Sequence, residues 1–226
     1  MIMAKLLIAC EESQVVCKAF RVFGIEAYSC DIQEPSGGHP EWHILGDALE
    51  AVQGGLVRTM DGEMHNVGKW DMLIAHPPCT YLSKAGANRL VIKGVIQEER
   101  MKKAMQAKAF FMALWEADCP RVVVENPVPI KIFGLPKYTQ IIQPYWFGDP
   151  WMKMTCLWLR GVPPLFATEL CIPDGKWVET TAHGRITKPD KWKKKGKKDP
   201  KERSKTFPGI AQAMAEQYGP LLLEEN

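Results

Sequence analysis

A cysteine near the middle of the chain has the surroundings of a nucleophile. Cys79 follows two prolines, Pro77 and Pro78, which come soon after the apolar run 72–75. Proline restricts the backbone, and a nucleophile gains rate when it is held in attack geometry. A lone thiol is more often a buried structural cysteine, but the double proline at a strand end favours the nucleophile. We therefore expect Cys79 to be catalytic.

A carboxyl group follows another apolar run at a comparable position. Glu125 comes after the run 122–124 and precedes Asn126 and Pro127. If both runs are strands of one parallel sheet, Glu125 and Cys79 lie near the same edge. A carboxyl group of raised pKa beside a thiol is what addition to a nitrogen heterocycle requires. The alternative is a glutamate that caps a helix.

Two aspartates follow further candidate strands. Asp31 comes directly after the run 27–30, and Asp47 comes soon after the run 42–45. Carboxylates at such strand ends can accept hydrogen bonds from the ribose hydroxyls or the adenine amino group of a nucleoside cofactor. Each aspartate could instead cap a helix, but their placement at adjacent strand ends favours a cofactor site.

The elements that must position these residues alternate along the chain. Short apolar runs alternate with longer helical patterns, which predicts an α/β fold with a mainly parallel sheet covered by helices on both faces. The predicted strands are 5–9, 27–30, 42–45, 72–75, 121–124 and 155–159.

Three helices are predicted around these strands. Ser13 is the expected N-cap of the first helix, which should end at Gly24. The apolar face of this helix is expected to consist of Val16, Phe20 and Phe23. Apolar residues at spacings of three and four predict the longest helix over 97–117. A third helix over 208–223 should close the domain.

Length and charge indicate one domain with a basic insertion. The 226 residues, 46% of them hydrophobic, suffice for one core and are few for two domains. Segment 161–205 is predicted to be irregular. Within it, 188–205 holds ten Lys or Arg against three Asp or Glu, which suits a phosphate-contacting element or a solvated loop. Trp177 and Trp192 could stack on bases or pack beneath this loop.

Composition argues against several other classes. Seven cysteines without framework spacing indicate reduced thiols. His39 and His43 have a ligand-like spacing, but no CxxC pair accompanies them, so we expect no metal site. No stretch approaches the roughly 20 apolar residues of a membrane span, and the start shows no leader pattern. We expect a cytoplasmic protein without a membrane partner.

At these residues the sequence resembles the DNA cytosine-5 methyltransferases, and more closely a compact branch common in phage and prophage genomes. Segment 77–79 matches the nucleophile motif, Glu125 with Asn126 matches the glutamate-asparagine motif, and 45–47 matches the glycine-aspartate pair that meets the cofactor adenine. Their order and spacing agree, and the resemblance covers nearly the whole chain. Segments typical of the compact branch are 76–83, 143–148, 155–159 and 203–211.

The resemblance implies a Rossmann-like methyltransferase fold, S-adenosylmethionine as cofactor, and methylation of a cytosine flipped out of double-stranded DNA in a bacterial cell. It implies catalytic roles for Cys79, Glu125, Lys153 and Thr155, the last two standing where the family usually has two arginines that hold the base. The implied cofactor contacts are Cys10, Glu11, Ser13, Asp31, Ile32, Asp47, Ala48 and Pro77. The expected DNA contacts are Lys191, Lys193, Lys194, Lys195, Lys197, Lys198 and Arg203.

Three alternatives remain open. An amino-methyltransferase would share the fold, but its motif has Asp, Asn or Ser before the two prolines and an aromatic residue after them, where this chain has His76 and Cys79. A non-catalytic DNA-binding or inhibitory protein on a degenerate methyltransferase fold would explain the first loop, 10–14, which lacks the family's glycines. It would not explain why both Cys79 and Glu125 are present. Methylation of RNA or of a free nucleotide is the third.

Overall fold

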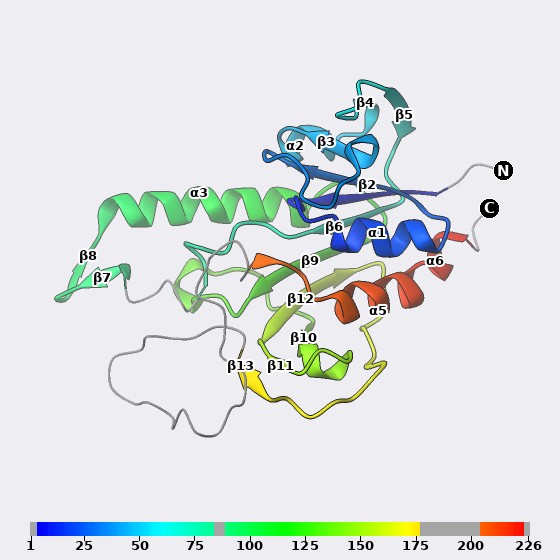
Figure 1. The fold of residues 1–226 in the computed structure, drawn as a ribbon. Coiled ribbons are helices and arrows are strands. Elements are labelled where there is room, and N and C mark those ends of the chain that lie inside the picture. Colours follow the sequence, from blue (N-terminus) through cyan, green and yellow to red (C-terminus); the bar gives the residue numbers. More distant parts are fainter. Residues whose placement is uncertain (1–3, 84–88, 177–203, 224–226) are drawn as a thin grey trace.

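A seven-stranded sheet forms the centre of the molecule (Figure 1). The computed structural model describes residues 4–83, 89–176 and 204–223. The strand order across the sheet is β10-β12-β9-β6-β1-β2-β3. These strands are β1 (Lys5–Ala9), β2 (Glu26–Asp31), β3 (His43–Leu45), β6 (Met72–Ala75), β9 (Val122–Pro127), β10 (Gln140–Ile142) and β12 (Thr155–Arg160).

The five strands from β9 to β3 run parallel to one another. β1 pairs with β2 and β6, β2 pairs with β3, and β6 pairs with β9. β12 is antiparallel to both β9 and β10, and β10 forms the opposite edge. The predicted α/β class with a mainly parallel, Rossmann-like sheet is confirmed. β10 was not predicted, because three residues carry too little periodicity to be recognised.

Helices cover both faces of the sheet because the central strands are apolar on both faces. Leu7 of β1 enters one core, and its neighbours Leu6 and Ile8 enter the other. Residues of α2 (Ala48–Ala51) and α3 (Glu98–Trp115) pack in the first core. Residues of α1 (Val15–Val22) and α5 (Pro208–Tyr218) pack in the second, where the two helices lie side by side (Figure 1). This two-sided burial is typical of a parallel sheet.

Short elements complete the described part of the chain. The small strands are β4 (Gly55–Arg58), β5 (Met64–Gly68), β7 (Val91–Ile92), β8 (Val95–Ile96), β11 (Trp151–Met152) and β13 (Gly175–Lys176), and the 3-10 turns are η1 (Pro40–Trp42), η3 (Lys131–Phe133) and η4 (Pro144–Trp146). Apart from β13, residues 161–176 are irregular. The rest of the predicted insertion up to residue 203, with Trp177 and Trp192, lies outside the described residues. No helix in the described ranges has the length and apolar character needed to cross a bilayer.

The predicted helices are present, with three corrections. The long helix α3 matches the prediction closely. The C-terminal helix is divided into α5 and α6 (Pro220–Leu223), because Pro220 has no N–H to continue the hydrogen bonding. Ser13 is not the N-cap of α1, since Gln14 holds that position. Phe23 follows the helix and is 42% exposed, so it does not belong to the buried face.

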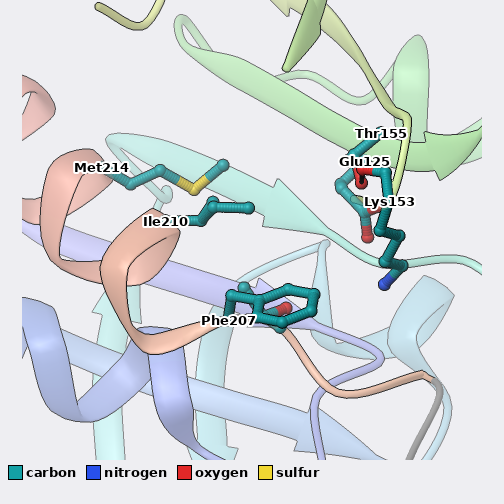
Figure 2. A pocket seen from close by; sticks show the side chains of 7 residues that line it. Glu125, Lys153, Thr155, Phe207, Ile210 and Met214 are labelled. Atoms are coloured by element: carbon teal, nitrogen blue, oxygen red, sulfur yellow. Dashed lines mark hydrogen bonds between the residues drawn. The ribbon is translucent and has the colours of Figure 1, made fainter. Parts of the chain in front are cut away.

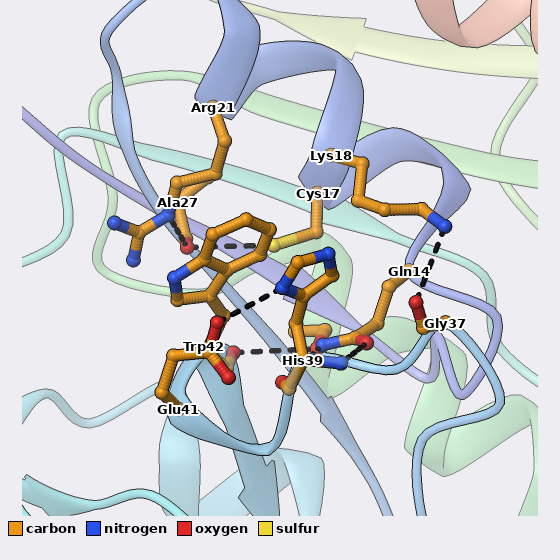
Figure 3. Close-up of polar contacts among 10 residues, drawn as sticks. Gln14, Cys17, Lys18, Arg21, Ala27, Gly37, His39, Glu41 and Trp42 are labelled. Carbon is orange, nitrogen blue, oxygen red and sulfur yellow. Dashed lines mark hydrogen bonds and ion pairs between the residues drawn. The ribbon is translucent and has the colours of Figure 1, made fainter.

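Gln14 fixes the loop between β1 and α1. Its φ of 57° is left-handed, a conformation that costs a non-glycine residue about 1 kcal/mol or more. Its side chain is fully buried. The amide donates to Ser29 Oγ at 3.1 Å and to the His39 carbonyl at 2.8 Å, and it accepts from the His39 N–H at 3.1 Å. Three hydrogen bonds therefore hold the strained residue in place (Figure 3).

The same contacts anchor the segment that follows β2. The His39 ring stacks on Trp42 with centroids 3.8 Å apart, and the Arg21 guanidinium lies 5.0 Å from the centre of the Trp42 ring. Gly37 passes so close to Gln14 that a Cβ at position 37 would lie 2.6 Å from Gln14 Cβ. The segment after Asp31 is thereby held against α1 (Figure 3).

We expect Gln14→Ala to lower the free energy of unfolding by about 2–4 kcal/mol, because it removes three hydrogen bonds of a buried side chain, including the one that the His39 N–H donates. Urea unfolding followed by circular dichroism measures the change. Gln53→Ala is the matched control, because Gln53 is exposed and its amide bonds only the Leu49 carbonyl. Equal stability of the two variants would contradict the role of Gln14.

Candidate active site

The parallel strands bring the predicted site residues to one edge of the sheet. In β1, β2, β3, β6 and β9 the carboxyl ends face the same way, and ligands of such sheets bind outside these ends. The residues at or just after these ends include Cys10, Asp31, Asp47 and Cys79, and Glu125 follows the last residue of β9 that pairs with β6. The sheet thus gathers the predicted nucleophile, carboxyl group and cofactor carboxylates at one edge.

The loop that carries Cys79 is tightly structured. Pro77 is buried, and Cys79 is partly exposed. The Cys79 carbonyl accepts the N–H groups of Leu82 at 3.2 Å and Ser83 at 3.0 Å, which closes a turn behind the thiol. Asn126 Nδ2 donates to the Pro77 carbonyl at 2.8 Å from within β9. The thiol loop is therefore anchored to the strand that carries Glu125.

Glu125 lies inside β9 rather than after it. β6 pairs with β9 only as far as Val124, and Glu125 continues the strand opposite Leu157 of β12. Its carboxylate Oε2 lies 3.1 Å from His76 Nδ1, and both side chains are largely buried, with exposures of 13% and 9%. Two side-chain contacts, His76 with Glu125 and Asn126 with Pro77, thus join the two strand ends.

The expectation of a raised pKa for Glu125 is wrong. Burial does raise the pKa, but the hydrogen bond with His76 and the positive charges of Lys153 and His76 lower it, and the net pKa lies below the usual value. The sequence could not reveal this, because His76 stands 49 residues away along the chain. Glu125 is therefore a carboxylate at neutral pH.

Lys153 and Thr155 lie beside Glu125, and their role in holding the base stays a prediction. Figure 2 shows these three side chains on one side of a small hollow, with α5 on the other. Lys153 Nζ lies 5.7 Å from the centre of the Phe207 ring.

The remaining wall of this hollow was not predicted. It consists of Thr206, Phe207, Ile210 and Met214. A signal for close packing here is Gly209, where a Cβ would overlap the Phe147 carbonyl. The Gly209 N–H also donates to Asp149 Oδ2 at 3.0 Å. The start of α5 is thus fixed against residues 147–149, which follow η4, and its apolar side chains face Glu125 (Figure 2).

The ends of β2 and β3 present groups that fit a nucleoside. Asp31 is partly buried at the end of β2, and the next residue, Ile32, has a side chain that is 79% exposed. Asp47 is exposed and caps α2 by accepting the Leu49 N–H at 2.8 Å, so the helix-cap alternative holds for it. A carboxylate beside an exposed aliphatic group can hold a ribose diol and pack against a purine ring. Ala48 is buried in the core.

The first loop takes a glycine-like backbone conformation without glycine. Cys10 has a φ of 61°, in the same left-handed region as Gln14. Burial, followed by the nearby acidic groups of Asp31, Cys30 and Asp47, raises the pKa of the Cys10 thiol. Cys10 therefore lies close to both predicted cofactor carboxylates. Ser13 is partly exposed, and its cofactor contact stays a prediction.

Glu11 turns inward instead of towards the open edge. It is 4% exposed, and its carboxyl oxygens accept the N–H groups of Val16 at 2.6 Å and Cys17 at 3.1 Å at the start of α1. Burial raises its pKa to about 7, although the charge of His76 and the two backbone hydrogen bonds oppose this shift. Its side chain caps the helix, and a direct cofactor contact stays a prediction.

The seven predicted DNA contacts, from Lys191 to Arg203, all lie outside the described residues. Within 4–83, 89–176 and 204–223, no group of three His, Cys, Asp or Glu side chains is arranged to hold a metal ion.

No protein-family model and no curated protein sequence matches the chain. Among solved structures, one similar fold is an E. coli protein encoded within a prophage and described as a DNA modification methyltransferase. It is 12% identical with a TM-score of 0.42, and the match covers 75% of this chain and 52% of that one. Another is the Entamoeba histolytica methyltransferase EhMeth, at 11% identity and a TM-score of 0.40, with coverages of 76% and 58%. The chain spans little more than half the length of each.

The raised pKa of Glu11 makes stability depend on pH. Because the folded protein binds this proton more tightly than the unfolded chain, the contribution is complete below about pH 4.5 and is lost as pH rises through about 7. We expect wild type to lose about 3 kcal/mol over this window relative to Glu11→Gln. Urea unfolding of both proteins at several pH values measures the difference. A stability difference that does not change with pH would contradict the buried carboxyl group.

Proposed function

We propose that this protein is an S-adenosylmethionine-dependent methyltransferase that acts on carbon 5 of cytosine in DNA. The observation that carries this proposal is the junction of the Cys79 loop with β9. There, Asn126 binds the Pro77 carbonyl at 2.8 Å and His76 contacts Glu125 at 3.1 Å. A partly exposed thiol and a carboxylate on neighbouring strands are the two groups that addition to a pyrimidine ring needs.

In the proposed reaction the chain's own residues activate the ring. The cytosine leaves the base stack, at a cost of a few kcal/mol, and enters the edge of the sheet. The Cys79 thiolate attacks carbon 6 while Glu125 contacts or protonates ring nitrogen 3, so that carbon 5 becomes nucleophilic. After methylation a base removes the carbon 5 proton and Cys79 leaves by elimination. Lys153 and Thr155 are proposed to hold the base, because both line the hollow beside Glu125.

S-adenosylmethionine supplies the activated methyl group when it is bound. Asp31 and Ile32 would hold its nucleoside, with Asp47 and Ala48 at the neighbouring strand end. Cys10, Glu11, Ser13 and Pro77 would border its other part, as the sequence resemblance implies. The left-handed backbone at Cys10 supports this role, since strained backbone concentrates at binding sites.

DNA as the substrate is proposed from the basic run 188–205, whose ten Lys or Arg residues suit contacts with phosphates. A cytoplasmic location follows from the same proposal and stays a prediction.

Wild-type protein with S-adenosylmethionine should form a covalent complex with DNA that contains 5-fluorocytosine, because fluorine at carbon 5 blocks the final elimination. Denaturing gel electrophoresis detects the complex. Cys79→Ser should abolish it. Cys119→Ser, at a buried cysteine that bonds backbone carbonyls of Trp70 and Arg121, should retain it. Absence of the wild-type complex on DNA of varied sequence would refute the proposed chemistry.

Asp31→Ala should weaken S-adenosylmethionine binding about 10-fold to 100-fold, because it removes hydrogen bonds to a charged group worth about 1.5–3 kcal/mol. Isothermal titration calorimetry measures the affinity. Asp61→Ala is the control, since Asp61 accepts its hydrogen bonds within the β4–β5 hairpin. Unchanged affinity in Asp31→Ala would remove this residue from the cofactor site.

A further inference from the structure

His76 lies at the meeting point of three strand ends. It follows β6 directly, and its backbone N–H donates to the Ala9 carbonyl of β1 at 2.9 Å. Its side chain is 9% exposed, and Nδ1 contacts Glu125 on β9. Its other ring nitrogen, Nε2, is buried and has no hydrogen-bond partner among the described residues. A buried ring with this placement calls for a role beyond packing.

The contact with Glu125 fixes one proton of this ring. An ionised carboxylate can only accept hydrogen bonds, and Glu125 is held in the ionised form. Nδ1 must therefore carry the hydrogen that is shared with Oε2 at 3.1 Å.

His76 interacts with two buried carboxyl groups. Glu11 in the loop after β1 and Glu125 on β9 are both buried carboxyl groups. Burial raises the pKa of each, and the charge of His76 lowers the pKa of each. The charge of Lys18 also lowers the pKa of Glu11, and the charge of Lys153 also lowers the pKa of Glu125. A positive charge on the ring compensates the negative charge of buried carboxylates, which would otherwise be costly.

The proposed reaction poses a difficulty that this arrangement resolves. Ring nitrogen 3 needs a proton when the thiolate adds to carbon 6, yet a carboxylate has none to give. Lys153 lowers the pKa of Glu125 through its positive charge. The Lys153 Nζ atom lies over the Phe207 ring. His76 shares a hydrogen with the carboxylate directly.

We propose that His76 stores the proton that Glu125 passes to the substrate ring. This inference rests on the proposed function. As the Cys79 sulfur bonds to carbon 6, ring nitrogen 3 takes a proton through Glu125, and Glu125 takes the Nδ1 proton of the imidazolium. A neutral imidazole with its hydrogen on Nε2 remains. Elimination of Cys79 reverses both transfers, so the proton returns to Nδ1 and none is consumed.

His76 is thus a positioning residue that acts through Glu125, and an asparagine can separate its two contributions. In His76→Asn the side-chain amide can donate a hydrogen bond from near the Nδ1 position, but it cannot give up a proton. If His76 only oriented Glu125, this variant would stay active. Because the proton is needed, we expect a large loss of rate. If His76→Asn fails to fold, the variant His76→Gln takes its place in the experiment.

The test measures covalent trapping by the full chain at saturating DNA on two substrates. With 5-fluorocytosine, His76→Asn should react about 100-fold more slowly than wild type, the lower range for loss of a general acid, while its KM for DNA stays within about twofold. With 5-azacytosine, whose ring is more electrophilic and needs less protonation, the loss should shrink to about 10-fold or less. His65→Asn, on the β4–β5 hairpin, is the matched control and should react like wild type.

The outcomes separate this inference from the proposed function. Trapping by His76→Asn within about threefold of wild type on both substrates would overturn the proton store and leave the function standing. An equal, large loss on both substrates would also overturn it, since a distorted site does not distinguish the rings. No adduct with the wild-type protein would refute the proposed function and the inference together.

Discussion

The two central strands, β1 and β6, are buried on both faces, so the polar residues that follow them in the sequence must lie beyond the strand ends. Leu6 and Leu7 of β1 enter different cores, and β6 is buried throughout. Polar side chains within these strands would lose their hydration without replacement. They stand instead beyond the carboxyl ends, where Cys10, His76 and Cys79 follow the apolar runs. The same burial that stabilises the sheet therefore collects the reactive groups at one edge.

The polar groups at that edge bind one another and nearby backbone groups. Glu11 binds two N–H groups of α1, Glu125 contacts His76, and Asn126 binds the Pro77 carbonyl. These contacts join the loop after β1, the loop after β6 and strand β9. The left-handed residue Gln14 persists beside them because its hydrogen bonds with Ser29 and His39 offset the backbone strain.

The antiparallel strand β12 contributes what the parallel strands lack. It enters the sheet next to β9 from the opposite direction, so its first residue, Thr155, and the preceding Lys153 arrive beside Glu125. The start of α5 lies across from them, held by Asp149 and by the close approach of Gly209 to Phe147. A basic, a hydroxyl and an apolar group thus surround one carboxylate, although they come from distant parts of the chain.

The sequence by itself determined the elements whose signals are local. The apolar runs located β1 and β6 to the residue, the helical period located α3, and the strand ends located Cys79, Asp31 and Asp47. Only the tertiary structure decided the state of the groups between them. The pKa of Glu125 is lowered rather than raised because His76 contacts it across two strands, and Glu11 rather than Ser13 binds the N–H groups at the start of α1. The sequence specifies the type of each side chain. Its protonation state and its hydrogen-bond partners depend on residues distant in the sequence, which come close only in the folded protein.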